Sequence, residues 1–142
     1  MPASRHALAL LAALAVGGFG ASGDSSSVEF KGEERAVAQV VEDLQEAGQR
    51  RDAQRMCEDL LAKPVVTRLT EAGRAAPEKR SCAQTLEESL KDADTFDLEV
   101  TKVTVTGGRA LATVSSDAGE KDRTNTLALV KEGRNWKLAE IR

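Results

Sequence analysis

The chain has 142 residues, of which 20 are basic and 23 are acidic, and its formal net charge is −3. A mildly acidic chain of mixed charge lacks the basic surface that binds nucleic acid or anionic membranes. The sequence has no tyrosine, and its single histidine, His6, lies near the amino end. A domain formed beyond that end therefore has no histidine for a nucleophilic triad or for His-ligated zinc.

The amino end has the pattern of an export signal. Arg5 precedes the run ALALLAALAV at residues 7–16, which contains no polar side chain. As a helix this run would be about 15 Å long, half the thickness of a bilayer core, so it is too short for a permanent anchor. The small residues of Ala21-Ser22-Gly23 are typical of a cleavage site. We expect residues 1–23 to be a signal peptide, and the mature chain to be secreted or held in the extracytoplasmic cell envelope with no integral membrane span.

A lipoprotein alternative competes at the same place. The stretch FGASGDS at residues 19–25 is similar to a bacterial lipobox in which Ser22 stands where the modified cysteine would be. A thioether to diacylglycerol needs a thiol, which Ser22 lacks, so the sequence as written does not predict lipid anchoring. Residues 24–33 are polar and rich in serine, and we expect them to form a flexible linker to a domain at residues 34–142.

The first half of this domain has helical periodicity. Apolar side chains recur at helical spacing from Val37 to Leu44, behind two acids that suit the start of a helix. Asp52 is an expected cap for a second helix that has Met56 and Cys57 on its inner face. Two further helices are expected: one from Pro64 through Leu69, then a loop at 71–80, and one from the capping box at Ser81–Gln84 through Leu90.

Cys57 and Cys82 both fall on expected inner faces of helices. In an exported chain an even pair of cysteines usually forms a disulfide. The spacing is not C-x-x-C, and neither cysteine has a histidine partner, so the pattern favours a structural cross-link over redox chemistry. Closing a loop of about 26 residues is worth about 3.5 kcal/mol in the chain-entropy estimate.

The second half reads as four strands in a meander. Apolar residues alternate from Phe96 to Val100 and then from Val103 on the opposite parity, so we expect a bulge near Thr101-Lys102. Gly107-Gly108 is expected to form a tight hairpin turn, DAGEKD at 117–122 a second turn, and Glu132-Gly133 a third.

Helices followed by a meander predict an α+β domain in which N-terminal helices pack on a bent four-stranded antiparallel sheet. Such a sheet and its helices enclose a cone, whose interior is either filled core or a pocket. Trp136, Phe96 and Met56 are the candidates for lining that pocket, although core packing is the ordinary role of such side chains.

The same pattern resembles the nuclear-transport-factor-2-like superfamily, also called SnoaL-like or cystatin-like, and in particular its small exported actinobacterial domains. The resemblance rests on AVAQVVEDLQEAGQRRDAQRMCEDLL, on Pro64, on SCAQTLEESL and on the ending VTKVTVTGGRALATVSS…TNTLALVKEGRNWKLAEI. It covers residues 34–142. Some members are isomerases or cyclases with a pocket aspartate and often tyrosine or histidine. Since this chain offers neither partner, no catalytic residue is transferred.

Two charged clusters are candidates for ion-binding sites. Asp92, Asp94 and Asp97 could hold calcium, but Phe96 occupies the place of a closely spaced ligand and the turn glycine is missing. The arginines from Arg50 to Arg55 could bind an anion, but a solvated helix junction is the ordinary reading. The sequence predicts no metal and no cofactor.

We therefore expect a non-catalytic exported domain of the cell envelope that binds a small apolar ligand or an envelope protein in or near the cone. One alternative is an isomerase- or cyclase-like enzyme using a single buried carboxylate with a raised pKa. The other is a structural or accessory envelope protein with no pocket.

Overall fold

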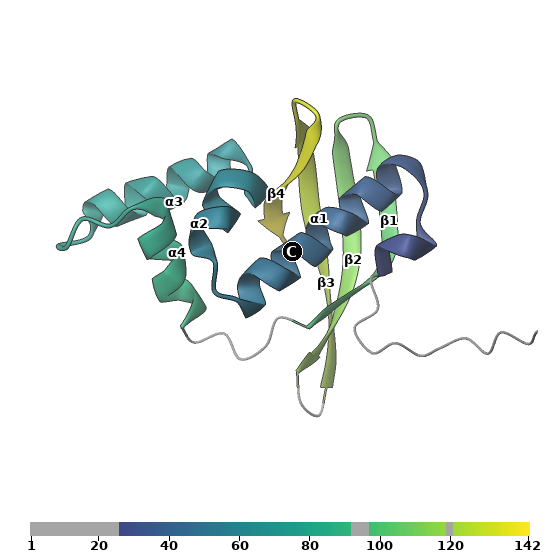
Figure 1. The fold of residues 1–142 in the computed structure, drawn as a ribbon, viewed down its shortest axis with the longest axis horizontal. Coiled ribbons are helices and arrows are strands. Elements are labelled where there is room, and N and C mark those ends of the chain that lie inside the picture. The colour runs from purple at the N-terminus through teal and green to yellow at the C-terminus, as the bar shows by residue number, and fades with distance from the viewer. Residues whose placement is uncertain (1–25, 92–96, 119–120) are drawn as a thin grey trace, which may run out of the picture.

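The computed structural model describes residues 26–91, 97–118 and 121–142, so the expected signal segment and Phe96 lie outside the described residues. Helices come first and four strands follow, which confirms the expected α+β fold (Figure 1). The helical elements are η1 (Ser26–Glu29), α1 (Gly32–Gln49), α2 (Ala53–Arg55), η2 (Met56–Leu60), α3 (Lys63–Ala75) and α4 (Cys82–Leu90). The strands are β1 (Leu98–Thr106), β2 (Arg109–Ala118), β3 (Lys121–Glu132) and β4 (Asn135–Ile141).

The strands form one antiparallel sheet in the order β1-β2-β3-β4. The expected bulge is confirmed between Val100 and Lys102, where the pairing of β1 with β2 shifts. A second shift, which the sequence did not predict, lies between Ala128 and Leu129 in the pairing of β3 with β4. Gly107 has a φ of +60°, which the first hairpin turn requires and which only glycine adopts without strain.

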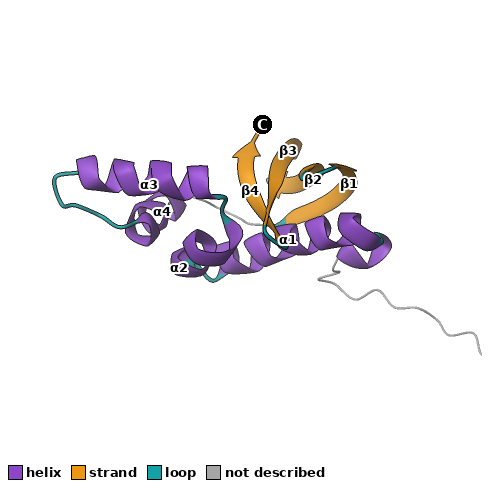
Figure 2. Ribbon diagram, turned by 90° about the horizontal axis from the view of Figure 1, so that it is seen from above, coloured by secondary structure: helices purple, strands orange, loops and turns teal. Residues whose placement is uncertain are grey.

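Helix α1 covers one face of the sheet, and the core lies between them. Val37, Val41 and Leu44 form the buried stripe of α1 at helical spacing. Figure 2 shows α1 along one side of the strands and no described helix on the other side. Each fully buried aliphatic side chain stabilises the fold by about 1.5–3 kcal/mol. From the sheet, the buried residues are Val100, Val103, Ala110, Ala112, Val114, Leu127, Leu129, Trp136 and Leu138.

The expected flexible linker at 24–33 is wrong for residues 26–33. Ser26–Glu29 forms a short 3-10 helix, and Glu33 already belongs to α1. The backbone N–H and the hydroxyl of Ser27 both donate to the Glu42 carboxylate, at 2.7 and 2.8 Å. Ser27 is only 3% exposed, so this pair of hydrogen bonds satisfies a buried polar group and fastens η1 to α1.

The chain after α1 covers the edge of β4. Asp52 accepts from the backbone N–H of Arg55 at 3.1 Å, so it caps α2 as expected. The expected second helix changes at Met56 into the π-helical turn η2. Leu61 then pairs with Leu138 as an isolated parallel bridge, and the N–H of Ala62 donates to the Leu138 carbonyl at 2.8 Å. These bonds leave β4 without an open edge at Leu138.

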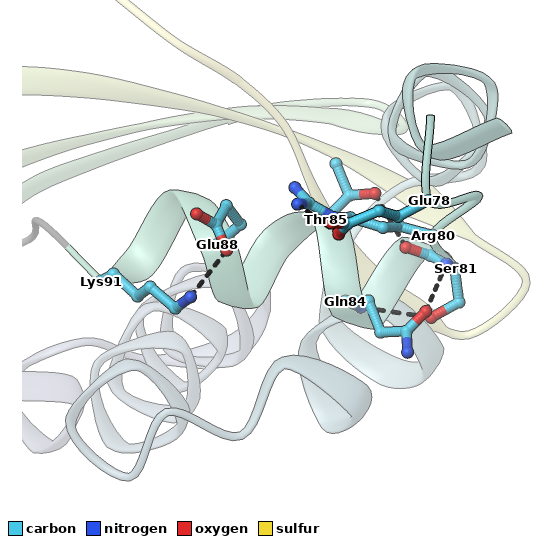
Figure 3. Close-up of polar contacts among 7 residues, drawn as sticks. All are labelled: Glu78, Arg80, Ser81, Gln84, Thr85, Glu88 and Lys91. Atoms are coloured by element: carbon cyan, nitrogen blue, oxygen red, sulfur yellow. Dashed lines mark hydrogen bonds and ion pairs between the residues drawn. The ribbon is translucent and has the colours of Figure 1, made fainter. Parts of the chain in front are cut away.

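Helices α3 and α4 form an arm that lies beyond β4 and packs mainly on itself and on α2 (Figures 1 and 2). The loop expected at 71–80 is wrong for 71–75, because α3 continues to Ala75. A carboxylate oxygen of Glu132 accepts from the backbone N–H of Lys63 at 3.0 Å and caps α3 from a strand. The predicted capping box of α4 is confirmed between Ser81 and Gln84 (Figure 3).

Cys57 and Cys82 form the predicted disulfide, with their Cα atoms 6.3 Å apart. The cross-link joins η2 to the first residue of α4. Leu90 is the only fully buried apolar side chain of the two arm helices, whereas Val66, Leu69 and Leu86 are partly buried. The arm therefore has little core of its own, and the disulfide supplies much of its attachment.

Replacing both cysteines by alanine should lower the free energy of unfolding by about 3.5 kcal/mol, because the unfolded chain regains the entropy of a closed loop. Amide hydrogen exchange should rise most in α3 and α4 and least in β2 and β3. Urea unfolding and exchange mass spectrometry measure both effects. Uniform exchange across arm and sheet would contradict this division.

Replacing Gly73 by alanine should also destabilise the arm. A Cβ there would overlap the carbonyl oxygen of Arg80 and lie 2.6 Å from the Thr85 hydroxyl oxygen. Because the Arg80 atom is backbone, the connection from α3 to α4 must shift, and overpacking of this kind costs about 1–3 kcal/mol. The urea midpoint should fall, although alanine is the better helix former. Gly108→Ala, which meets no atom within 4 Å, is the matched control.

Candidate functional site

The face of the sheet opposite α1 carries a hollow of about 380 Å³ that spans all four strands. Its floor consists of small or apolar side chains, with Leu111 in the centre of the sheet. Leu111 is 42% exposed, one of two large apolar side chains exposed among the described residues. The volume lies within the range of small-molecule sites. The outward-facing residues of the lining are Thr104, Thr106, Arg109, Leu111, Ala128, Val130, Glu140 and Arg142.

Strand pairing places these residues in rows. Leu111 lies between Thr104 on β1 and Ala128 on β3, and Ala128 pairs in turn with Glu140. The neighbouring row runs from Thr106 through Arg109 and Val130 to Lys137. Ala128 is the smaller of the two side chains that pair with Leu111, so it leaves room above the sheet at this point of β3. The shift between Ala128 and Leu129 brings Glu140 into line with this row.

The charged groups of this face differ in whether they form ion pairs or hydrogen bonds within the chain. Arg142 donates from Nε to Glu140 at 3.2 Å. The Lys137 ammonium donates to the backbone carbonyl of Asp59. Arg109 makes no ion pair or side-chain hydrogen bond with any residue that the structure describes. The hollow therefore combines an apolar floor with one unpaired guanidinium at its rim.

Two other hollows have linings in which several charged groups are paired within the chain. One, of about 450 Å³, lies along α4, where Arg80 pairs with Glu78 and Lys91 pairs with Glu88 (Figure 3). The other, of about 570 Å³, lies beside Cys57 between η2, α3 and the β3–β4 turn. Several of its lining residues are engaged, through contacts of Gln54 with Glu58, Glu132 with Lys63, and Lys137 with Asp59. Neither hollow offers the apolar floor of the sheet face.

The residues predicted to line an interior pocket have other surroundings. Trp136 and Met56 are 2% and 6% exposed and belong to the hydrophobic core. Neither lines any of these three hollows. Their role as pocket lining therefore stays a prediction, and that of Phe96 lies outside the described residues.

Trp136 instead forms a polar cluster with Glu33 and Lys131. The indole N–H donates to one Glu33 oxygen at 2.7 Å, and the Lys131 ammonium donates to the other at 2.8 Å. The ammonium also lies 5.7 Å from the centre of the Trp136 ring, within cation–π range. The hydrogen bond from Lys131, followed by that from Trp136, lowers the pKa of Glu33. This cluster ties the start of α1 to β3 and β4.

The arginines and aspartates considered as ion sites lie at different places in the fold. Arg50 pairs with Glu46, and Arg51 donates to the Leu90 carbonyl at 3.3 Å. Arg55 lies near the carboxylates of Asp43 and Glu46, so the arginine cluster is occupied within the fold. Of the three aspartates weighed for calcium, Asp97 is exposed, and Asp92 and Asp94 lie outside the described residues. Lys102, beside the bulge of β1, is exposed.

The described part of the chain offers few side chains suited to acid–base catalysis or metal binding. No set of three or more potential metal ligands lies close together there. Hydrogen bonding with Lys91 lowers the pKa of Glu88, and the same bond raises the pKa of Lys91. Like the shift at Glu33, these shifts favour the charged forms and do not bring a group nearer to neutral pH. Across the residues the structure describes, no helix has the length and apolar character needed to cross a membrane.

Comparison of the chain with protein-family models, with curated proteins and with solved structures gave no match. Sequence reasoning missed the hollow on the sheet face, although a signal was present: in RALATV, Leu111 falls on the parity opposite to Ala110, Ala112 and Val114.

Glu33→Gln should reduce the dependence of stability on pH. A carboxyl whose pKa is lowered on folding stabilises the native state above its ordinary pKa of 4.5, and this contribution is lost as the pH falls through the lowered value. The variant keeps an acceptor for Trp136 but loses the charge that attracts Lys131. Urea unfolding, followed by Trp136 fluorescence at pH about 7 and about 3, should show a smaller loss of stability on acidification than in the wild type.

Glu34→Gln is the matched control for that measurement. Glu34 is exposed, follows Glu33 in α1, and makes no side-chain hydrogen bond or ion pair with a described residue. It should therefore keep the pH dependence of the wild type. The same acid sensitivity in Glu33→Gln as in the wild type would show that the cluster does not couple folding to pH.

Proposed function

We propose that the chain is an exported binding domain of the cell envelope that takes a small apolar ligand on the open face of its sheet. The observation that carries this proposal is the hollow of about 380 Å³ across all four strands, lined mainly by apolar atoms. Apolar lining with a few polar groups is typical of small-molecule sites. Binding there would remove Leu111 from water and contribute through the hydrophobic effect.

The site differs from the one expected inside the cone. Trp136 and Met56 are packed in the core with Leu129 and Leu138, which supports a filled interior at their positions. Opening that interior would expose buried apolar surface, at a cost of about 25 cal/mol for each Å². The outer face requires no such rearrangement, because Figure 2 shows no described helix over it.

An isomerase- or cyclase-like activity would need a buried carboxylate with a raised pKa. Ser27 is the one buried polar side chain among the described residues, and no described carboxyl is buried. The described part of the chain therefore gives this alternative no candidate residue. An accessory protein without a ligand remains the competing function, and the binding experiment below separates the two.

Export is the second part of the proposal. The Cys57–Cys82 disulfide is compatible with a protein outside the cytoplasm, and the sequence of residues 1–23 has the pattern of a signal peptide. Intact mass of secreted material should correspond to an oxidised chain that lacks those residues. Membership of the nuclear-transport-factor-2-like superfamily is likewise proposed, supported by helices that precede a bent meander sheet.

Filling the hollow should abolish binding of an apolar probe without unfolding the protein. Ala128→Phe adds an aromatic ring to the floor, and phenylalanine is favoured in strands. In a titration with the neutral dye Nile red, whose emission rises in apolar surroundings, this variant should bind at least about tenfold more weakly than the wild type, a loss of about 1.4 kcal/mol.

Thr124→Phe is the matched control, because Thr124 lies on β3 at the same parity as Ala128 but outside the hollow. It should bind the dye as the wild type does, and both variants should keep the wild-type melting temperature within a few degrees. Undiminished binding by Ala128→Phe would refute the site. No binding by the wild type would favour the accessory function.

A further inference from the structure

We infer that the ligand is an amphipathic monoanion, an unbranched fatty acid, whose carboxylate is bound by Arg109 while its hydrocarbon chain lies across the floor of the hollow. This inference rests on the proposed function, since it names the class of ligand for the same site. It depends on three observations: the position of Arg109, its lack of a partner, and the direction of the apolar floor.

Arg109 lies at the end of the hollow next to the first hairpin turn. It is the first residue of β2, directly after Gly107-Gly108, and it pairs with Thr106 on β1 and Val130 on β3. Neither neighbour carries a charge. The guanidinium therefore stands between a hydroxyl-bearing and an aliphatic side chain at the rim of the hollow, where a head group can reach it from solvent.

The other cations beside the hollow are engaged with groups of the chain, and Lys102, which is exposed on β1 of the same face, does not line the hollow. Arg142 is paired with Glu140, and Lys137 donates to the Asp59 carbonyl. Arg109 has no ion pair or side-chain hydrogen bond with a described residue. A planar guanidinium without a partner matches a carboxylate in charge and in bidentate geometry. Charge complementarity thus selects an anionic head group and rejects a cationic one.

The floor continues away from Arg109 as apolar surface. Leu111 is two residues further along β2 and pairs with Ala128 on β3, next to the pair that Arg109 forms with Val130. Beyond them, Glu140 carries a negative charge that Arg142 balances, so the far end of the hollow offers no second free cation. A ligand with one anionic end and an apolar body therefore fits this site better than a dianion or a ligand charged at both ends.

Decanoate and its uncharged analogue decanol, both below their micelle concentrations, test the inference by isothermal titration calorimetry with the purified disulfide-bonded protein. The wild type should bind decanoate more tightly than decanol. Arg109→Gln should weaken decanoate binding about tenfold and leave decanol binding within about twofold, because it removes a charge-assisted hydrogen bond but keeps the floor. Arg109→Lys should lie between them, since lysine keeps the charge but not the fork.

Lys102→Gln is the matched control, because it removes an exposed cation from β1 that does not line the hollow. It should bind decanoate as the wild type does. Arg109 is exposed and lies outside the core, so circular dichroism and the melting temperature should be the same for all variants.

Equal affinity of the wild type for decanoate and decanol would overturn the inference and leave the proposed function intact. Failure of both to bind would also overturn it, and the Nile red titration then decides the proposed function by itself. Vesicles of phosphatidylcholine with and without phosphatidylglycerol supply a further arm. Arg109-dependent binding to the anionic vesicles without decanoate binding would replace the carboxylate by a lipid phosphate and overturn the inference.

Discussion

The packing of α1 against one face of the sheet determines what the opposite face presents. Successive side chains of a strand point to opposite faces, so a residue that packs on α1 forces its neighbours outward. Ala110 and Ala112 are buried against the helix, and Leu111 between them is therefore exposed. Ala128 likewise faces outward between the buried residues Leu127 and Leu129, and it is partly exposed. The hollow on the open face is thus a consequence of the register that the core fixes, and slipping β2 by one residue would destroy both.

A second set of contacts covers the β4 edge of the sheet and holds the helices beside it. The bridge between Leu61 and Leu138 covers the edge, the Glu132 carboxylate caps α3, and the disulfide holds α4 against η2. Each of these contacts joins segments far apart in the sequence. They leave the arm tethered at its base while its outer helices bury little apolar surface. The arm therefore contributes little to the core, and the edge of the sheet is covered by Leu61 and Ala62, which precede it.

The elements that depend on local chemistry were predictable from the sequence. The cap at Asp52, the capping box at Ser81, the bulge after Val100 and the turn at Gly107 all follow from short-range rules, and the structure has them. The elements that were predicted wrongly depend on partners far away in the sequence. Ser27 is ordered because Glu42 accepts its hydrogen bonds, and no local pattern in a serine-rich stretch contains that information.

The candidate site was harder to predict for the same reason. The sequence makes Trp136, Phe96 and Met56 candidates for pocket lining, although core packing is their ordinary role. In the fold, Trp136 has its polar atom satisfied by Glu33 and its ring covered by the core. The hollow is instead made by the absence of bulk at Ala128, and a small side chain gives no signal until the strands around it are placed in register.

Separating the core face from the open face also separates stability from binding. The outward-facing residues that line the hollow are exposed or partly exposed, so changing them costs little buried apolar area, whereas changing Leu129 or Val114 would open a cavity in the core. An unpaired Arg109 costs little folding free energy on such a face, because solvent hydrates the guanidinium there. The same charge in the interior would need a partner. A sheet packed on one side only can therefore keep a charge and an apolar floor ready for a ligand without weakening the fold that holds them in place.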